Sequence, residues 1–200
     1  MRHYKRPMTI VRGNAEYRLN DKHSLNLNYV LNRAGNKQYD EMDKTYVPTN
    51  DVLVKHIVGL SYNQSFLNGR LNNVFFLKDY INHLKVEQTE LSFITGSDAV
   101  KPSNTQSYWG YGVGTRLTVS EPWAIKASYE HSVRLPIARE LLGNGSTIYR
   151  NIVLRPESSE NFNLGLFGNI TLAPSHHLYY EVNGFIRLVD DYIKTTVKEQ

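Results

Sequence analysis

Apolar and polar residues alternate with a period of two along most of the chain. From Val11 to Leu19 the odd-numbered positions are mostly apolar or aromatic, whereas the even-numbered positions are polar or charged. The segment 24–32 repeats the pattern, with leucine or tyrosine opposite serine and asparagine. Successive side chains of a β-strand point to opposite faces, so this period predicts strands with one apolar face and one polar face. A helical period would scatter the asparagines around the helix.

Six further segments continue the alternation and bring the expected total to about eight strands. Each would span about ten to thirteen residues, roughly twice the usual length of a strand in a globular protein. Tilted strands of about 9–11 residues are long enough to cross the hydrocarbon layer of a membrane. The six segments are 54–66, 70–80, 108–119, 123–134, 159–172 and 178–187.

Short and long connections alternate between these segments. Asn68-Gly69 favours a two-residue hairpin turn, because both residues tolerate positive φ angles. All long connections would lie at one end of the sheet, as in an up-and-down outer-membrane barrel with tight periplasmic turns and long outer loops. The short turns are expected near 20–22, 67–69, 120–122 and 173–175, and the long segments over 33–52, 81–106 and 134–158.

Aromatic residues gather near both ends of the expected strands, as the two interfacial girdles of a membrane barrel require. Aromatic residues also favour strands in general, so a soluble β-sandwich or lipocalin-like barrel is an alternative. Strand length and the loops at one end favour the membrane barrel. Tyr17, Tyr62, Phe66, Trp123 and Tyr180 lie near short turns, and Tyr29, Tyr80, Trp109, Tyr111 and Tyr129 lie towards long connections.

Composition excludes several other classes of protein. The 200 residues have a mean hydropathy of −0.46, and none of their apolar runs approaches the roughly 18 residues of a membrane helix. There is no cysteine, so disulfides and thiolate metal sites are excluded. The net charge of +4 comes from scattered residues, which argues against nucleic-acid binding. Residues 1–7 are basic but no apolar core follows them, so we expect no intact signal peptide.

No arrangement of residues indicates catalysis, a cofactor or a metal site. The glycines at 110, 112 and 114 recur with period two, so we interpret them as a smooth inward strip of a strand rather than a nucleotide-binding turn. His176 and His177 are neighbours in a strand and would point to opposite faces. No carboxylate stands at a recognisable spacing from a nucleophile or histidine. We therefore expect no enzyme.

The stretch from Ser132 to Gly165 carries a specific combination of residues. This order and spacing resembles a recurrent signature in the barrel of TonB-dependent outer-membrane receptors of Gram-negative bacteria. Val133 and Leu142 stand where that signature usually has aromatic residues, which is a conservative departure. The signature comprises Ser132-Val133-Arg134-Leu135-Pro136, Glu140-Leu141-Leu142-Gly143, Asn151, Leu154, Pro156-Glu157, Ser159, Asn161 and Leu164-Gly165.

The resemblance implies an active transporter in the outer membrane. Such a receptor is a 22-stranded barrel with an N-terminal plug, is surrounded by lipid and is energised by the TonB complex. It takes up a siderophore, cobalamin, another metal chelate or a glycan, and the sequence does not indicate which. We expect residues 1–200 to form a single segment of the barrel wall, without the plug and the C-terminal strands. A soluble β-rich module and a complete eight-stranded barrel are the alternatives.

The alternation also predicts where two charged residues lie. Polar positions are even-numbered in the segment that ends at Arg134 and odd-numbered in the segment near Ser159, which extrapolates back to Glu157. The two segments should be antiparallel neighbours joined by the 134–158 connection. We therefore predict that Arg134 and Glu157 lie on the inner side at the base of this loop and form a charge-assisted pair that anchors it.

Overall fold

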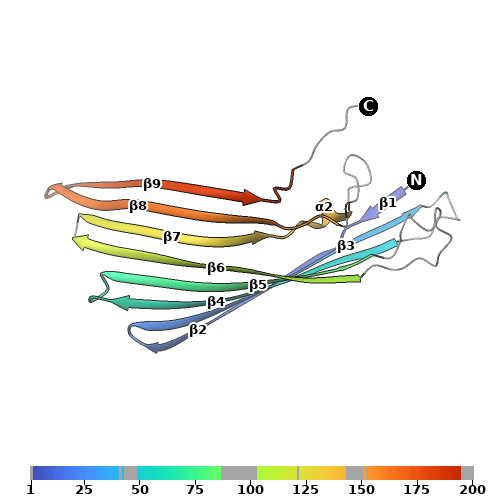
Figure 1. Cartoon of the computed structure of the whole chain (residues 1–200), viewed down its shortest axis with the longest axis horizontal. Helices are drawn as coiled ribbons and strands as arrows, with labels where there is room; N and C mark the ends of the chain where they lie inside the picture. Colours follow the sequence, from blue (N-terminus) through green and yellow to red (C-terminus); the bar gives the residue numbers. More distant parts are fainter. Residues whose placement is uncertain are drawn as a thin grey trace.

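A single antiparallel sheet makes up most of the structure (Figure 1). The computed structural model describes residues 2–40, 42, 49–86, 103–120, 122–142, 151 and 153–194. No helix among them is both long and apolar enough to span a bilayer. The elements are β1 (Arg2–Lys5), β2 (Met8–Asn20), β3 (His23–Asp40), β4 (Thr49–Phe66), β5 (Leu71–Lys85), β6 (Ser103–Ser120), β7 (Trp123–Arg134), α2 (Ala138–Leu142), β8 (Glu157–Ala173) and β9 (His176–Asp190).

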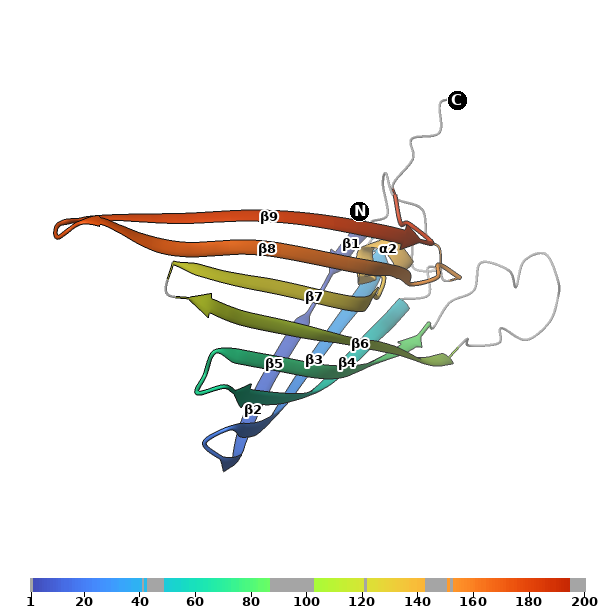
Figure 2. The same ribbon diagram turned by 60° about the vertical axis from the view of Figure 1, so that its left-hand side comes forward.

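The strands from β2 to β9 pair in chain order, each antiparallel to the next. This confirms the predicted all-β, up-and-down meander of eight long strands. The sheet twists strongly, so that β2 and β3 cross β8 and β9 at a steep angle (Figure 2). Among the described strands β2 and β9 lie at opposite edges of the sheet and are not paired. A closed barrel of eight strands is therefore not the arrangement observed.

The short strand β1 was not predicted from the sequence. It pairs with the end of β3, between Lys37 and Asp40, and β2 pairs with the rest of the same edge. Pro7 separates the two strands, because proline has no N–H group to donate to the ladder. The Pro7 carbonyl still accepts a hydrogen bond from the Gly35 backbone N–H at 2.8 Å. The two strands thus form one interrupted edge.

Most strands are longer than the alternation predicted. Strand β3 continues to Asp40 and β4 begins at Thr49, so most of the expected connection over 33–52 is paired strand. Strands β5 and β6 likewise extend to Lys85 and from Ser103. Backbone pairing does not require an apolar face, so polar residues such as Asn36 and Lys37 continue the ladder. The connection over 134–158 is confirmed, since β7 ends at Arg134 and β8 begins at Glu157.

The four expected short turns are all present, and one differs in detail. Phe66 pairs with Leu71, so four residues rather than two join β4 to β5. Leu67, Asn68 and Gly69 all have positive φ angles, of 50°, 55° and 84°. The Asn72 side-chain amide donates to the Gly69 carbonyl at 2.7 Å and stabilises the turn. The Asn-Gly pair was a correct signal for a hairpin but did not predict the turn's length.

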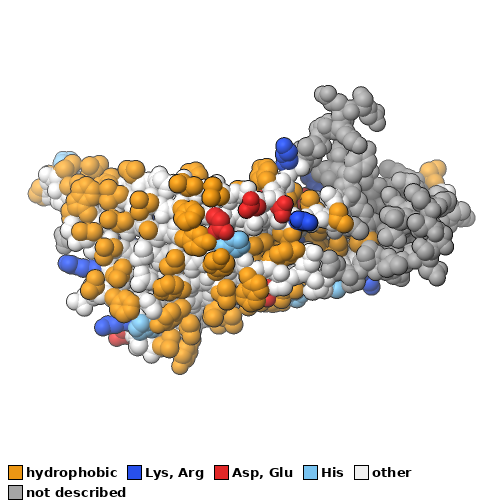
Figure 3. Space-filling model, viewed as in Figure 1, with side chains coloured by type: hydrophobic (Ala, Val, Ile, Leu, Met, Phe, Trp, Pro, Cys, Tyr) orange, Lys and Arg blue, Asp and Glu red, His pale blue; other side chains and the backbone are white. Residues whose placement is uncertain are grey.

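The two faces of the sheet differ in chemistry. We call the face on which α2 packs the inner face and the opposite one the outer face. Figure 3 shows apolar side chains spread over much of one face of the sheet. On the outer face, register places Leu27, Leu60, Leu77 and Tyr111 in one row across β3 to β6, and each is 44–48% exposed. A continuous apolar row of this kind is typical of a surface that contacts lipid.

Candidate functional site

A small apolar core holds part of the β7–β8 connection against the inner face. Leu141 and Leu142 of α2 are buried against Leu53 of β4 and Leu84 of β5. Val86, just after β5, is fully buried in the same cluster. The first part of the connection, up to Leu142, therefore folds inward over the sheet. We call residues 135–142 the strap.

The strap has local reasons to form a helical turn. Ile137 precedes α2, and its backbone N–H donates to the Glu140 Oε2 at 2.8 Å. This is the reciprocal half of a capping box, in which the third helical residue reaches back to the N-cap position. The other carboxylate oxygen of Glu140 accepts a hydrogen bond from the Arg134 Nη2 at 2.6 Å. Glu140 thus starts the helix and ties it to the end of β7.

Lys55 of β4 attaches the first residues of the strap to the inner face of the sheet. Its Nζ donates to the Leu135 carbonyl at 3.4 Å and also to the Pro136 carbonyl. Both of these strap residues are buried. Lys55 belongs to β4 and the strap begins at the end of β7, so the strap crosses the inner face past β5 and β6. A charged donor holding two carbonyls makes this a strong attachment.

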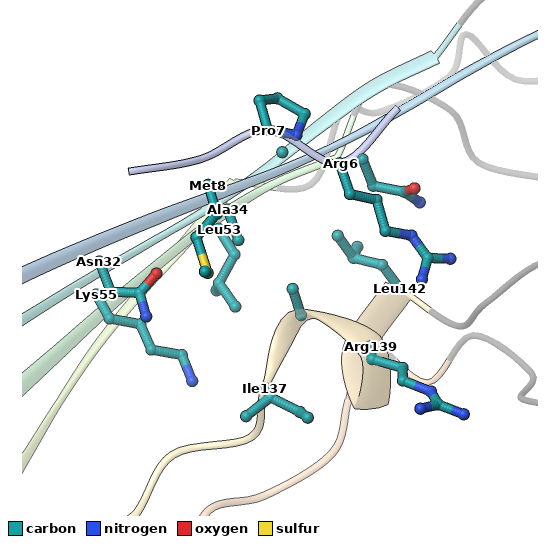
Figure 4. A pocket seen from close by; sticks show the side chains of 13 residues that line it. Arg6, Pro7, Met8, Asn32, Ala34, Leu53, Lys55, Ile137, Arg139 and Leu142 are labelled. Atoms are coloured by element: carbon teal, nitrogen blue, oxygen red, sulfur yellow. The ribbon is translucent and has the colours of Figure 1, made fainter. Parts of the chain in front are cut away.

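A cavity of about 390 Å³ lies between the strap and the strands β2, β3 and β4 (Figure 4). Leu53, Ile137 and Leu142 supply apolar surface to it. Its basic lining residues come from three places: Arg6 from the β1–β2 junction, Lys55 from β4 and Arg139 from α2. A largely apolar cavity with a few converging polar groups is the usual form of a small-molecule site.

A buried amide also lines the cavity. Asn36 is only 3% exposed, and neither its Nδ2 nor its Oδ1 has a hydrogen-bond partner among the described residues. On the same face, the buried Oδ1 of Asn82 likewise has no partner within the described ranges. Buried polar atoms in folded proteins are nearly always hydrogen-bonded, so an unpaired amide at a cavity indicates a place for a polar group.

The structure places Arg134 and Glu157 opposite one another in the β7–β8 register. The two residues were predicted to pair directly, and this is wrong, because each has another partner. Arg134 binds Glu140, while Glu157, at 4% exposure, accepts hydrogen bonds from the Arg187 Nη2 at 3.1 Å and the Ile193 backbone N–H at 3.3 Å. The capping role of Glu140 brings its carboxylate to Arg134, and β9 presents Arg187 to Glu157. Neither charge is left unpaired.

The glycine strip lies within β6, on the inner face, and neighbouring side chains cover it. A Cβ added at Gly110 would lie 2.9 Å from the Tyr80 ring, and one added at Gly112 would lie 2.5 Å from the Phe76 ring. Between these two rings, Lys78 reaches across β6 to the Glu130 Oε1 at 3.0 Å. The close approach that the glycines predicted is therefore made by side chains of β5.

A cluster of polar residues on the outer face was missed. The Tyr129 hydroxyl donates to the Glu160 Oε2 at 2.7 Å, and the His131 Nδ1 lies 2.6 Å from the Glu160 Oε1. The Tyr111 ring stacks on His131 with centroids 5.1 Å apart. The sequence did contain a signal for this cluster, because His131 and Glu160 are polar residues at positions where the alternation expects apolar ones. His177 lies beside Thr171, and no metal-binding group of three such ligands occurs in the described part of the chain.

Long antiparallel strands with an apolar outer face and a polar inner face define the wall of a membrane β-barrel. A family model described as TonB dependent receptor-like, beta-barrel, matches residues 83–198. The chain therefore belongs to this family of outer-membrane barrels, as its sequence signature indicated.

Two solved structures share the fold. One is titled copper transporter OprC, with a TM-score of 0.73 and 16% identity over 96% of this chain and 30% of that one. The other is a double mutant of the Serratia marcescens hemophore receptor HasR in complex with its hemophore HasA and heme, with a TM-score of 0.60 and 15% identity over 98% of this chain and 36% of that one. The chain thus spans about a third of these proteins. No curated protein sequence matches it.

Proposed function

We propose that this chain forms a single segment of the barrel wall in a TonB-dependent transporter of the outer membrane. The observation that carries the proposal is the contrast between the two faces. The outer face exposes an apolar row across β3 to β6, while the inner face carries polar side chains and an inward-folded strap. Lipid would contact the first face and the transport path the second. Transport rather than catalysis is the role that such a wall supports.

The transported ligand is a scarce nutrient such as a siderophore, cobalamin or a glycan. The cavity beneath the strap is the candidate contact for it, since it lies on the inner face near the end of the sheet where the long connections lie. The titles of the two structural neighbours name copper and heme as what those proteins handle. Those names support a metal or its chelate as one class within the proposed range.

Two further elements belong to the proposal. The energy for transport comes from the TonB complex, which acts through a part of the receptor outside these strands. Arg134 and Glu157 act as anchors at the base of the β7–β8 connection. Each does so through its own partner, Glu140 for Arg134 and Arg187 for Glu157. Glu140 lies in the connection itself, and Arg187 lies on β9, the strand paired with β8.

The test uses the natural gene product in its own host. It should fractionate with the outer membrane and need detergent for extraction, since its apolar outer face is stable only in lipid. Cells that depend on it for a scarce metal chelate should lose uptake when TonB is deleted. Recovery of the protein as a soluble periplasmic monomer, or uptake that persists without TonB, would contradict the proposal.

A further inference from the structure

The cavity beneath the strap has an unbalanced charge. Arg6 and Arg139 both line it, and neither has an ion-pair partner among the described residues. None of the described lining residues is an aspartate or a glutamate. The strap's own carboxylate, Glu140, is already engaged by Arg134 and by the Ile137 backbone N–H. The buried carboxylate of Asp51 lies across from Asn36 in the β3–β4 register, outside the cavity lining. The charged residues that do line the cavity are therefore all basic.

Two further residues of the sheet, Lys55 and Asn36, also favour a negatively charged or hydrogen-bond-accepting ligand. Lys55 is held in place by two strap carbonyls, so its positive charge stays beside the cavity. The Asn36 amide is nine-tenths buried and has no partner within the described ranges. Its Nδ2 can donate two hydrogen bonds to an acceptor in the cavity. The buried amide is an independent sign that a polar group belongs there.

The lining residues and the volume of the cavity indicate which kind of ligand it can bind. Arg6 reaches from the β1–β2 junction towards α2, and Arg139 projects from α2 itself (Figure 4). A guanidinium group binds carboxylates and phosphates through two parallel hydrogen bonds. Leu53, Ile137 and Leu142 form the apolar part of the lining and can contact the carbon skeleton of a ligand. The volume, about 390 Å³, suits a small molecule or one portion of it.

We propose that this cavity binds an acidic group, a carboxylate or a phosphate, carried by the transported small molecule. Arg6 and Arg139 bind the negative charge, the Asn36 amide donates to one of its oxygens, and the apolar residues contact the adjoining carbon skeleton. This rests on the proposed function, because it names the chemical class of ligand for the same site. It excludes neutral glycans as ligands of this cavity.

The experiment measures binding to the natural gene product purified in detergent, by isothermal titration calorimetry at low ionic strength. The probes are citrate, inorganic phosphate and triethyl citrate, which is the uncharged ester of citrate. We expect citrate, phosphate or both to bind and the ester not to bind. Binding of citrate alone identifies a carboxylate site, and binding of phosphate alone identifies a phosphate site. Either result supports an acidic ligand.

The variants Arg6→Gln and Arg139→Gln should each weaken anion binding about tenfold, as expected for losing a charged hydrogen-bond donor. Arg12→Gln is the matched control, because Arg12 lies on the inner face of β2 and does not line the cavity. An absence of binding by both anions, equal binding of the ester, or equal loss in the control overturns the proposal. Outer-membrane fractionation and TonB-dependent uptake, measured in parallel, report separately on the proposed function.

Discussion

The two faces of the β7–β8 pair satisfy their polar groups in different ways. On the inner face Asn161 Nδ2 donates to Ser132 Oγ and Ser159 Oγ, both at 3.1 Å, in a chain of polar side chains. On the outer face one carboxylate, Glu160, takes both nearby donors, Tyr129 and His131. The first arrangement extends along the strands, and the second is closed and surrounded by rings.

The contacts proposed for the two faces account for this difference. Water on the inner side can replace any hydrogen bond that is lost, so an open polar network is tolerated there. Lipid offers no such replacement, and a polar group on the outer face has to be satisfied by its neighbours. The His131–Glu160 pair lies towards the loop end of β7 and β8. Four experiments break or sharpen this comparison.

The largest effect is expected from a charge placed on the outer face. Leu164 is 62% exposed on that face, and its chain neighbour Asn163 points inward, where it bonds Ser128. Leu164→Arg should destabilise the folded barrel by about 2–4 kcal/mol in lipid, the cost of an arginine at mid-membrane. Asn163→Arg is the control and should change little. Urea unfolding in lipid vesicles measures both, and equal tolerance of the two would contradict the assignment of the faces.

The next effect concerns the attachment of the strap. Lys55→Met removes the charged donor to the Leu135 and Pro136 carbonyls and should cost about 1.5–3 kcal/mol of local stability. Hydrogen exchange at the Leu141 backbone amide should then accelerate at least about tenfold. Lys126→Met, which changes an inner-face lysine on β7 away from the strap, is the control. Unchanged exchange in Lys55→Met would mean that the apolar core alone holds the strap.

A third substitution tests whether the inner face is as permissive as its polar character indicates. Gly112→Ala places a Cβ 2.5 Å from both the Phe76 ring and the Tyr129 carbonyl oxygen, and should destabilise by about 1–3 kcal/mol. Gly114→Ala meets only the Ser128 Cβ, at 3.9 Å, and should be neutral or slightly stabilising. The difference between their urea midpoints is the readout. Equal midpoints would mean that Phe76 does not pack over the strip.

The smallest effect separates the two anchors. In double-mutant cycles, Glu157→Gln with Arg187→Gln should show a coupling of about 1 kcal/mol, because Glu157 is buried and accepts a charged hydrogen bond. Glu157→Gln with Arg134→Gln should be additive, since Arg134 pairs with Glu140. The free energies of unfolding of the single and double variants give both values. Strong coupling between Arg134 and Glu157 would show instead that these two residues pair directly.

The sequence was sufficient for the eight long strands, their order and their faces, though not for β1. Alternation sets which side chains share a face, so parity placed Arg134 and Glu157 on the inner face. The connection that joins their strands placed them at the same end of the sheet. The ends of β3 and β4 were missed because polar residues continue a ladder without an alternating signal. Strand pairing is predictable here because each long strand pairs with the next one along the chain.

The candidate site was not predictable in the same way. Arg6, Lys55 and Arg139 lie far apart in the sequence and meet only because the strap folds inward. Glu140 belonged to the family signature without a structural role, and its capping bond to Ile137 depends on a helix of five residues with no periodic signal. The partner of Glu157 comes from β9, which a comparison of β7 and β8 does not include. Each of these facts requires the tertiary arrangement.

The central claim, that one face of the sheet contacts lipid and the other does not, can be tested along β7. The chain has no cysteine, so the single variants Ile125→Cys, Lys126→Cys, Ala127→Cys and Ser128→Cys each offer one site for a fluorescent label. In vesicles of brominated lipid, labels at 125 and 127 should be strongly quenched and those at 126 and 128 should not. Equal quenching at adjacent positions, or the opposite alternation, would contradict the account.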